Sequence, residues 1–225
     1  MYTIEQKQTK ALKKEYCKYL GATEGVDKSM IKDCLTHYMI PEVDYTDKVC
    51  LDLGGNVGGF TKIAIDGGAA KVYTIECDPR NYEKMKASFA DEPKANIIHA
   101  AVSGSNTETI KIYKGNSNSS HCSTSILKRS MFKDYDEVRN IHIRALLNKY
   151  KPDIIKIDIE GAEYEIIKDV AEYFPEVLFV ELHMGKVKEY ALPTIELLTS
   201  IYPNHLVNSF EVFKNIGGYD CWFKK

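Results

Sequence analysis

Two stretches of the sequence place acidic residues and a histidine where apolar runs end. In "IIKIDIEG", Lys156, Asp158 and Glu160 alternate with isoleucines, and in "LFVELH", Glu181 and His183 stand two residues apart. Alternate residues of a strand point to the same face. If the two segments are neighbouring strands, these polar side chains therefore converge at one mouth, where carboxylates and an imidazole can orient a hydroxyl group and accept its proton.

Each residue of this cluster has a functional and a structural interpretation. His183 is the first choice as general base, because the unperturbed pKa of imidazole lies near neutrality, and Asp158 is expected to orient the acceptor or contact a cofactor. The structural alternatives are that Glu160 caps the next helix and that His183 is merely a polar strand end. Lys156 is expected to pair with a neighbouring carboxylate, and Glu163 suits the dipole of the following helix. The cluster also offers ligands for Mg²⁺, but the spacing does not require an ion.

A third stretch, "CLDLGGNVGGFTK" (residues 50–62), packs four glycines into six positions behind an apolar run. Glycine here indicates either a tight turn with positive φ or a ligand pressed against the main chain. The turn opens a helix, whose N-terminal amides favour negative charge, and ligands of α/β sheets bind beyond the carboxyl ends of strands. Glu76 ends the next strand, 18 residues beyond Gly58, where a carboxylate reaches ribose hydroxyls. A nucleotide-like cofactor is predicted.

The spacing of the turn separates two cofactors. A dinucleotide site has the pattern G-x-G-x-x-G, whose middle glycine admits a pyrophosphate. Here Asp52 precedes Gly54 by two residues, and Gly55, Asn56 and Gly58 follow. A carboxylate repels pyrophosphate but helps to hold a cationic amino-acid group, directly or through water. The turn thus favours S-adenosylmethionine over NAD, with a dehydrogenase as the alternative.

Predicted strands and helices alternate along the segments that carry these residues. Strands are predicted at 48–55, 71–78, 95–104, 152–160 and 176–183, and helices at 59–68, 79–92, 163–174 and 187–200. This alternation predicts an α/β fold with a mostly parallel sheet and helices on both faces. Residues 205–225 are expected to form an antiparallel hairpin with its turn at 215–218, and helices are expected at 5–20 and 28–39. The domain prediction is an N-terminal helical appendage (1–47) followed by one domain (48–225).

The chain resembles the FkbM family of S-adenosylmethionine-dependent methyltransferases in two motifs. "DLGGNVGGFT" is similar to the family's D-V-G-A-N-x-G-x-x-T, and "KIDIEGAE" is similar to its D-x-E-G-x-E. The resemblance covers residues 48–185. It implies a Rossmann-like class I methyltransferase fold with a seven-stranded sheet and a C-terminal antiparallel hairpin.

By position, the resemblance also implies site roles. The glycine-turn residues would hold the methionine end of the cofactor: Asp52, Gly54, Gly55, Asn56, Gly58 and Thr61. Glu76 would bind the ribose, and Cys77 or Asp78 would flank the adenine, for which Ala101 and Val102 are further candidates. The catalytic candidates are Asp158, Glu160, Glu181 and His183.

The family's association with O-methylation implies that the methyl acceptor is a hydroxyl group. A sugar or glycan is the leading candidate, and a small secondary metabolite is the alternative. A nucleic-acid or cap methyltransferase would need a basic, aromatic groove, and only short lysine clusters occur, in the first 20 residues and at 127–130. A non-catalytic cofactor-binding scaffold is the alternative from another class. The polar loop at 114–125 is read as either a solvated loop or a polyol contact through Ser119, Ser120 and His121.

The composition limits which binding partners and which cellular compartment can be expected. The net charge of −2 provides no field that would recruit nucleic acid or anionic lipid. Six scattered cysteines without a C-x-x-C pair are expected to be free thiols of a reducing cytosol. With no signal-like start and no long apolar run, a soluble cytoplasmic protein is expected. Trp222 is read as a core residue, and the sequence does not indicate an oligomeric state.

Overall fold

The computed structural model describes residues 4–22, 25–113, 124–126, 134–183, 188–213 and 216–225. Seven strands form the main sheet in the order β3-β2-β1-β7-β8-β10-β9. They are β1 (Val49–Leu53), β2 (Lys71–Glu76), β3 (Ala95–His99), β7 (Ile154–Ile157), β8 (Val177–His183), β9 (Asn204–Phe213) and β10 (Ile216–Lys224). Neighbours pair in parallel except β10, which is antiparallel to both β8 and β9. The predicted Rossmann-like sheet with a C-terminal hairpin is confirmed.

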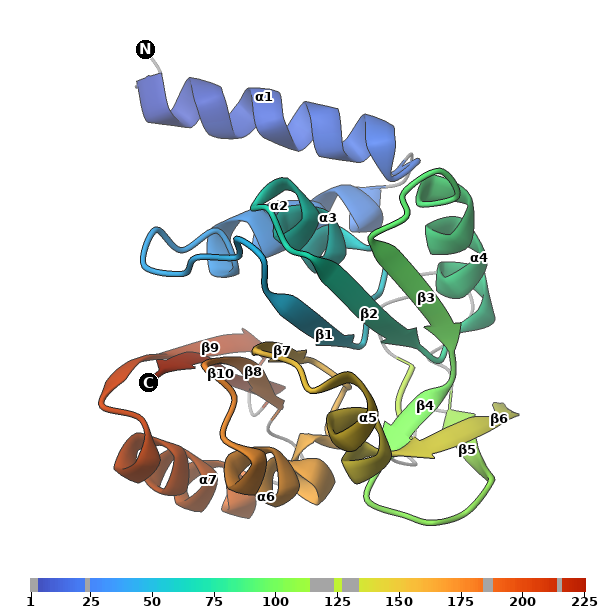
Figure 1. Ribbon diagram of the computed structural model, residues 1–225, viewed down its shortest axis with the longest axis vertical. Helices are drawn as coiled ribbons and strands as arrows, with labels where there is room; N and C mark the ends of the chain where they lie inside the picture. Colours follow the sequence, from blue (N-terminus) through green and yellow to red (C-terminus); the bar gives the residue numbers. More distant parts are fainter. Residues whose placement is uncertain (1–3, 23–24, 114–123, 127–133, 184–187, 214–215) are drawn as a thin grey trace.

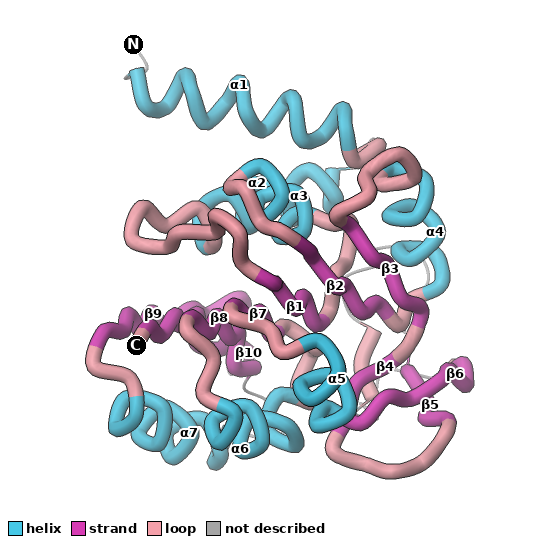
Figure 2. Tube along the Cα trace, in the orientation of Figure 1, coloured by secondary structure: helices cyan, strands magenta, loops and turns pink. Residues whose placement is uncertain are grey.

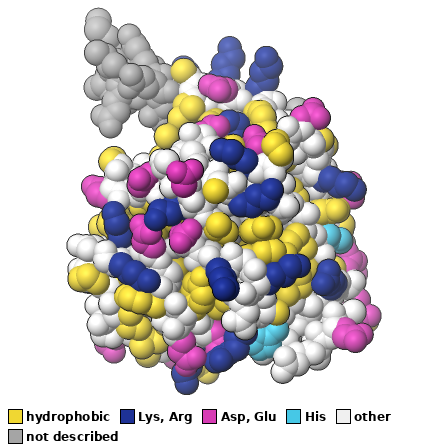
Figure 3. Space-filling view, viewed as in Figure 1, with side chains coloured by type: hydrophobic (Ala, Val, Ile, Leu, Met, Phe, Trp, Pro, Cys, Tyr) yellow, Lys and Arg dark blue, Asp and Glu magenta, His cyan; other side chains and the backbone are white. Residues whose placement is uncertain are grey.

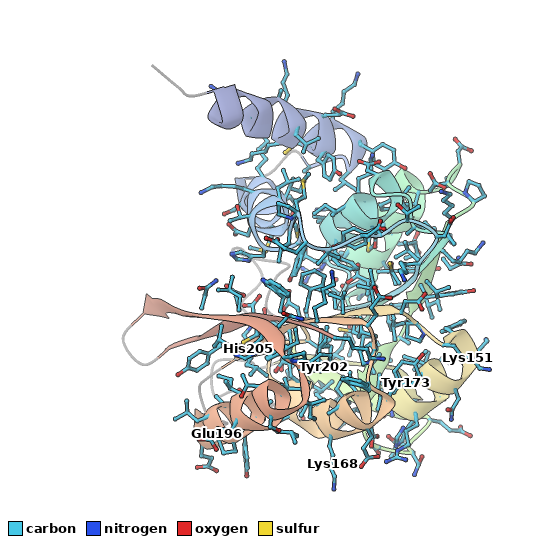
Figure 4. All side chains as sticks on the ribbon, turned by 60° about the vertical axis from the view of Figure 1, so that its left-hand side comes forward. Lys151, Lys168, Tyr173, Glu196, Tyr202 and His205 are labelled. Atoms are coloured by element: carbon cyan, nitrogen blue, oxygen red, sulfur yellow. The ribbon has the colours of Figure 1, made fainter. Side chains whose placement is uncertain are left out.

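Helices cover both faces of this sheet (Figure 1, Figure 2). One face carries α1 (Ile4–Tyr19), α2 (Gly25–His37), α3 (Gly59–Asp66) and α4 (Pro79–Ser88), and the other carries α5 (Ile143–Tyr150), α6 (Glu163–Tyr173) and α7 (Lys188–Ile201). Figure 4 shows Tyr202 between the sheet and the second helix layer, with Lys168 and Glu196 projecting outward from that layer. None of the described helices is both long and apolar enough to cross a membrane.

Each face of the sheet has its own hydrophobic cluster. On the α5–α7 side, the cluster includes Ile155, Leu178 and Tyr202. On the other side, Ile31 of α2 packs in the same cluster as Phe179 of β8. The first 47 residues therefore share a core with the sheet, and their separation as an appendage stays a prediction.

The structure differs from the predicted order of strands and helices between the third predicted strand (95–104) and the fourth (152–160). The strand expected at 95–104 divides: β3 ends at His99, and β4 (Ala101–Ser103) leaves the main sheet. β4 pairs with β6 (Tyr135–His142), which pairs with β5 (Thr109–Tyr113), as a second, three-stranded sheet. β5, β6 and α5 were not expected from the sequence. Two of them carry a local signal: the alternating isoleucines of "TIKIY" mark β5, and the helical spacing of apolar residues in "IRALLNKY" marks α5.

Smaller features also bear on the predictions. β10 begins at Ile216, so residues 216–218 belong to the strand and not to the hairpin turn. The described cysteines are free thiols, as expected: Cys17, Cys34, Cys50, Cys77 and Cys221. On the face shown in Figure 3, lysine and arginine side chains are interspersed with aspartate and glutamate.

Candidate active site

The glycine turn after β1 packs directly on the segment that follows β7. Gly54 has φ of 83°, and a Cβ atom there would lie 1.8 Å from the main-chain oxygen of Asp158. A side chain at this position would force the two segments apart. Gly58 also has positive φ, at 92°, and begins α3 as its N-cap. The glycines thus serve a tight turn and a close approach that brings the two sequence motifs into contact.

Lys156 lies at the centre of this contact. Its buried Nζ donates to the carbonyl oxygen of Gly54 at 2.6 Å. The same atom lies 3.4 Å from Asp52 Oδ1 and 3.5 Å from Asp158 Oδ2. Burial lowers the pKa of Lys156, but the carboxylates of Asp158 and Asp52 outweigh burial and raise it. Lys156 is therefore a cation that joins the two motifs, which confirms its interpretation as a partner of neighbouring carboxylates.

Asp52 and Thr61 stand behind the turn and are not among the described residues that line the cavity next to it. Asp52 is fully buried, and its Oδ2 accepts a hydrogen bond of 2.8 Å from Thr61 Oγ1. Burial raises the pKa of Asp52, while Lys156 and Thr61 oppose that rise. The cofactor contact expected of Asp52, directly or through water, stays a prediction. Its side chain acts on the site through Lys156.

A cavity, here called the central cavity, opens at the carboxyl ends of the strands. Nine of the predicted site residues line it: Gly54, Asn56, Glu76, Cys77, Ala101, Val102, Asp158, Glu160 and Glu181. Six do not line it: Asp52, Gly55, Gly58, Thr61, Asp78 and His183. The sequence analysis missed lining residues from other elements, among them Met30 of α2, Asn81 of α4, Thr124 and Ile126. No local pattern marks Met30, because its position depends on how α2 packs.

Glu76 presents a buried carboxylate to the central cavity. It is 5% exposed. Its Oε1 accepts from the main-chain N–H of Asp78, and its Oε2 accepts from that of Asn56, both at 2.7 Å. Burial raises the pKa of Glu76 to about 7, although these two backbone donors oppose the rise. Each carboxylate oxygen has two lone pairs, so Glu76 can accept two further hydrogen bonds from a bound diol.

Asp78, a candidate for the adenine contact, begins a helix and does not line the central cavity. Its Oδ1 accepts from the main-chain N–H of Arg80 at 2.9 Å, which caps α4. Its Oδ2 accepts from Thr124 Oγ1 at 2.9 Å. Burial raises the pKa of Asp78, but its hydrogen bonds with Arg80 outweigh burial and lower it. Asp78 therefore anchors residues at the cavity rim.

Glu163 holds together the loop that contains the second motif. Glu160 and Gly161 have positive φ, at 57° and 102°. The Oε1 atom of Glu163 accepts from the main-chain N–H of Ile159 at 3.1 Å and from that of Gly161 at 3.0 Å. Glu163 is fully buried. Beyond suiting the helix dipole, its carboxylate fixes the strained loop that directs Glu160 toward the cavity.

His183 lies among three carboxylates. Its Nδ1 is 3.0 Å from Glu163 Oε1, and its Nε2 is 3.3 Å from Glu181 Oε1 and 3.7 Å from Glu160 Oε2. Burial lowers the pKa of His183, but these carboxylates, Glu163 foremost, outweigh burial and raise it well above its usual range. These contacts favour the imidazolium form of His183, which cannot accept a proton. They therefore disfavour His183 as general base, a role that stays a prediction.

Three of these residues are also placed to hold a metal ion. Asp158, Glu181 and His183 each offer one ligand atom, and the three atoms lie within 4.8 Å of one another. Mg²⁺ prefers an all-oxygen shell, whereas imidazole with carboxylates suits Mn²⁺ or Zn²⁺ better. The convergence predicted for the ends of β7 and β8 is confirmed by this distance.

The end of the polar loop reaches the cavity rim. Ser119, Ser120 and His121 lie outside the described residues. Ser125 Oγ donates to the main-chain oxygen of Glu160 at 2.6 Å. Together with the hydrogen bond of Thr124 to Asp78, this contact places the segment 124–126 over the second motif.

Comparison with known proteins agrees with this architecture. The methyltransferase FkbM domain model matches residues 52–205. The chain is similar to the crystal structure of methyltransferase FkbM from Methylobacillus flagellatus KT, with a TM-score of 0.52 and 16% identity over 84% of this chain and 47% of that one. It is also similar to a candidate RNA methyltransferase from Pyrococcus horikoshii, with a TM-score of 0.50 and 12% identity over 100% and 99% of the two chains.

At these identities the structural likeness shows the fold alone, and this chain spans about half the length of the Methylobacillus protein. No curated protein sequence matches the chain. The family model covers both motifs of the central cavity and most of the main sheet. The chain belongs to the FkbM methyltransferase domain family.

Proposed function

We propose that this protein is an S-adenosylmethionine-dependent O-methyltransferase that methylates a hydroxyl group of a sugar or glycan. The observation that carries the proposal is the central cavity itself. A buried carboxylate, Glu76, lines its β2 end, and two further carboxylates, Asp158 and Glu181, line it at β7 and β8. This arrangement suits a cofactor with a ribose at one end and a cationic group at the other.

The lining residues fit the parts of S-adenosylmethionine. Glu76 would accept hydrogen bonds from the two ribose hydroxyls, and Cys77 and Val102 would provide apolar contacts for the adenine. Asp158, beside the glycine turn, would attract the cationic methionine end. When bound, the cofactor supplies a methyl group on a sulfonium, which is already activated for transfer. The chain then has to orient the acceptor hydroxyl and remove its proton.

Glu181 is the residue best placed to accept that proton. Burial and the neighbouring Asp158 raise the pKa of Glu181, and a carboxylate with a raised pKa is a stronger base. His183, as an imidazolium 3.3 Å away, would hold the carboxylate in place. In this role Glu181 would take up the hydroxyl proton of the acceptor while the cofactor supplies the methyl group and leaves as a neutral thioether.

The test is methyl transfer from radiolabelled S-adenosylmethionine to a panel of sugars and glycans, with RNA as the competing acceptor. Glu181→Gln should lower kcat by roughly 100-fold, the low end of what a general base contributes. The matched control is Glu196→Gln, because Glu196 is exposed on the outer side of α7. Transfer to RNA but to no sugar, or an unaffected Glu181→Gln variant, would contradict the proposal.

The proposal includes no metal ion, although Asp158, Glu181 and His183 could bind one. The same assay with EDTA therefore has a defined outcome. We expect the rate to be unchanged by EDTA and by added Mg²⁺ or Mn²⁺. A rate that is lost with EDTA and restored by either ion would assign these residues to a metal site instead.

A further inference from the structure

A second hollow, here called the α2 groove, adjoins the central cavity. Its volume is about 510 Å³, within the range of small-molecule sites. Strands β8, β9 and β10 contribute its floor, and the end of α2 with the following segment contributes its wall. In Figure 1 the light-blue segment that follows α2 lies above the red strands at the left. Glu181 lines both the central cavity and the α2 groove.

The floor of the groove combines apolar and polar side chains. On β10, Phe223 packs with the α5–α7 cluster, whereas Trp222 packs against the cluster of the opposite face. Directly opposite residues of an antiparallel pair share a face, so Leu206, which pairs with Trp222, also lies on the groove side. Trp222 thus packs against the core, as expected, and also lines the groove.

One cross-strand pair adds the polar part of the floor. Asp220 pairs with Asn208, and both line the groove. A carboxylate and an amide beside an indole are the groups that recognise a ring with hydroxyls at its edge and an apolar face. The floor therefore matches a saturated polyhydroxylated ring.

The wall comes from the segment whose role the sequence did not indicate. His37, Tyr38, Ile40 and Glu42 line the groove. His37 Nε2 lies 3.6 Å from Asp220 Oδ2, which joins the wall to the floor. The end of α2 is therefore part of a site as well as part of the core.

The charge of the groove selects among ligands. Three carboxylates line it, those of Glu42, Glu181 and Asp220, and they outnumber the two imidazoles of His37 and His205. A phosphate or sulfate group would be repelled here, whereas neutral hydroxyls would find acceptors.

We propose that the α2 groove binds the methyl acceptor and that this acceptor is a pyranoside ring without a phosphate group. The inference rests on the proposed function, because Glu181 connects the groove to the central cavity. Trp222 and Leu206 would contact the apolar face of the ring, while Asp220 and Asn208 would bind its hydroxyls.

The test uses saturation-transfer NMR with three probes: methyl α-glucopyranoside, methyl α-galactopyranoside and glucose 6-phosphate. Leu206→Arg places a long cation in the groove, and Leu197→Arg on α7 is the matched control. Leu206 is 46% exposed and Leu197 41% exposed, so neither change disturbs the core. We expect transfer to at least one neutral pyranoside with wild type and control, at least fivefold less with Leu206→Arg, and none from wild type to glucose 6-phosphate.

Calorimetric titration with S-adenosylhomocysteine on the same three proteins separates the two proposals. Equal affinity in all three is expected, because Leu206 lies outside the central cavity. Equal transfer in Leu206→Arg and wild type, a preference of wild type for the phosphate, or no transfer to any pyranoside would overturn the groove assignment. Absent S-adenosylhomocysteine binding by folded wild type would instead count against the proposed function.

Discussion

At the scale of single residues, the properties of the site depend on which cations and hydrogen-bond donors offset the charges of its buried carboxylates. His183 is within 3.7 Å of three carboxylates, and Glu76 has only backbone N–H partners in the contacts described. The sequence could predict that Glu181 and His183 lie together, because alternate residues of a strand point to the same face. It could not give the protonation of His183, because Glu163 reaches the ring from a helix.

The first prediction concerns the charge of His183. Its folded pKa is raised above the usual 6.5, so its stabilising contribution is complete below pH 6.5 and is lost as pH rises through the folded pKa. NMR of the ring should show an imidazolium at pH 7.5. Glu163→Gln should lower this pKa, whereas Glu165→Gln, exposed on the same helix, should not. A ring that titrates near 6.5 in wild type would contradict the assignment.

The second prediction concerns Glu76. Its pKa is about 7 in the folded protein and 4.5 ordinarily. Between these values the folded state binds more protons than the unfolded chain, so stability falls as pH rises through this window. The difference in the free energy of unfolding between Glu76→Gln and wild type should therefore grow in favour of the variant from pH 4.5 to pH 8, by on the order of 3 kcal/mol. Urea unfolding at both pH values measures this, and a constant difference would refute it.

At the scale of elements, close contact between two turns assembles the site. The strands β1, β7 and β8 were predictable because continuous apolar runs bounded by turn residues mark buried strands. The departure of β4 was not, since Ala100 is followed by apolar residues that suit either sheet. The glycine turn was read as a ligand site, and the structure adds that Gly54 abuts Asp158.

The third prediction separates this contact from backbone strain. Gly54 and Gly21 both have positive φ, but a Cβ at Gly21 would meet nothing within 4 Å. Gly21→Ala should cost about 1 kcal/mol of stability from the left-handed conformation alone. Gly54→Ala should cost at least about 3 kcal/mol, because the clash adds overpacking. Equal losses in the free energy of unfolding would show that the contact with Asp158 is unimportant.

At the scale of the whole molecule, segments from both ends of the chain complete the structure around the sheet. α2 shares a hydrophobic cluster with β1 and β8 and forms the α2 groove with β9 and β10. The sequence motifs and family resemblance predicted the main sheet, since each strand carries its own pattern. They could not predict the groove, because it depends on packing between segments near opposite ends of the chain.

The fourth prediction tests whether the first 47 residues fold with the sheet. Ile31 of α2 is fully buried, so Ile31→Ala should cost about 2–5 kcal/mol. Trp222, the single tryptophan of the chain, reports on β10 by fluorescence. The urea midpoints from circular dichroism and from Trp222 fluorescence should shift together. An unshifted fluorescence midpoint would show that the N-terminal helices are a separate folding unit.

The central claim is that the central cavity binds S-adenosylmethionine through Glu76. Calorimetric titration with S-adenosylhomocysteine tests it most directly, on wild type, Glu76→Ala and the exposed control Glu196→Ala. We expect micromolar binding by wild type and control, and at least tenfold weaker binding by Glu76→Ala, a loss of about 1.4 kcal/mol. No binding by folded wild type, or equal binding by Glu76→Ala, would contradict it.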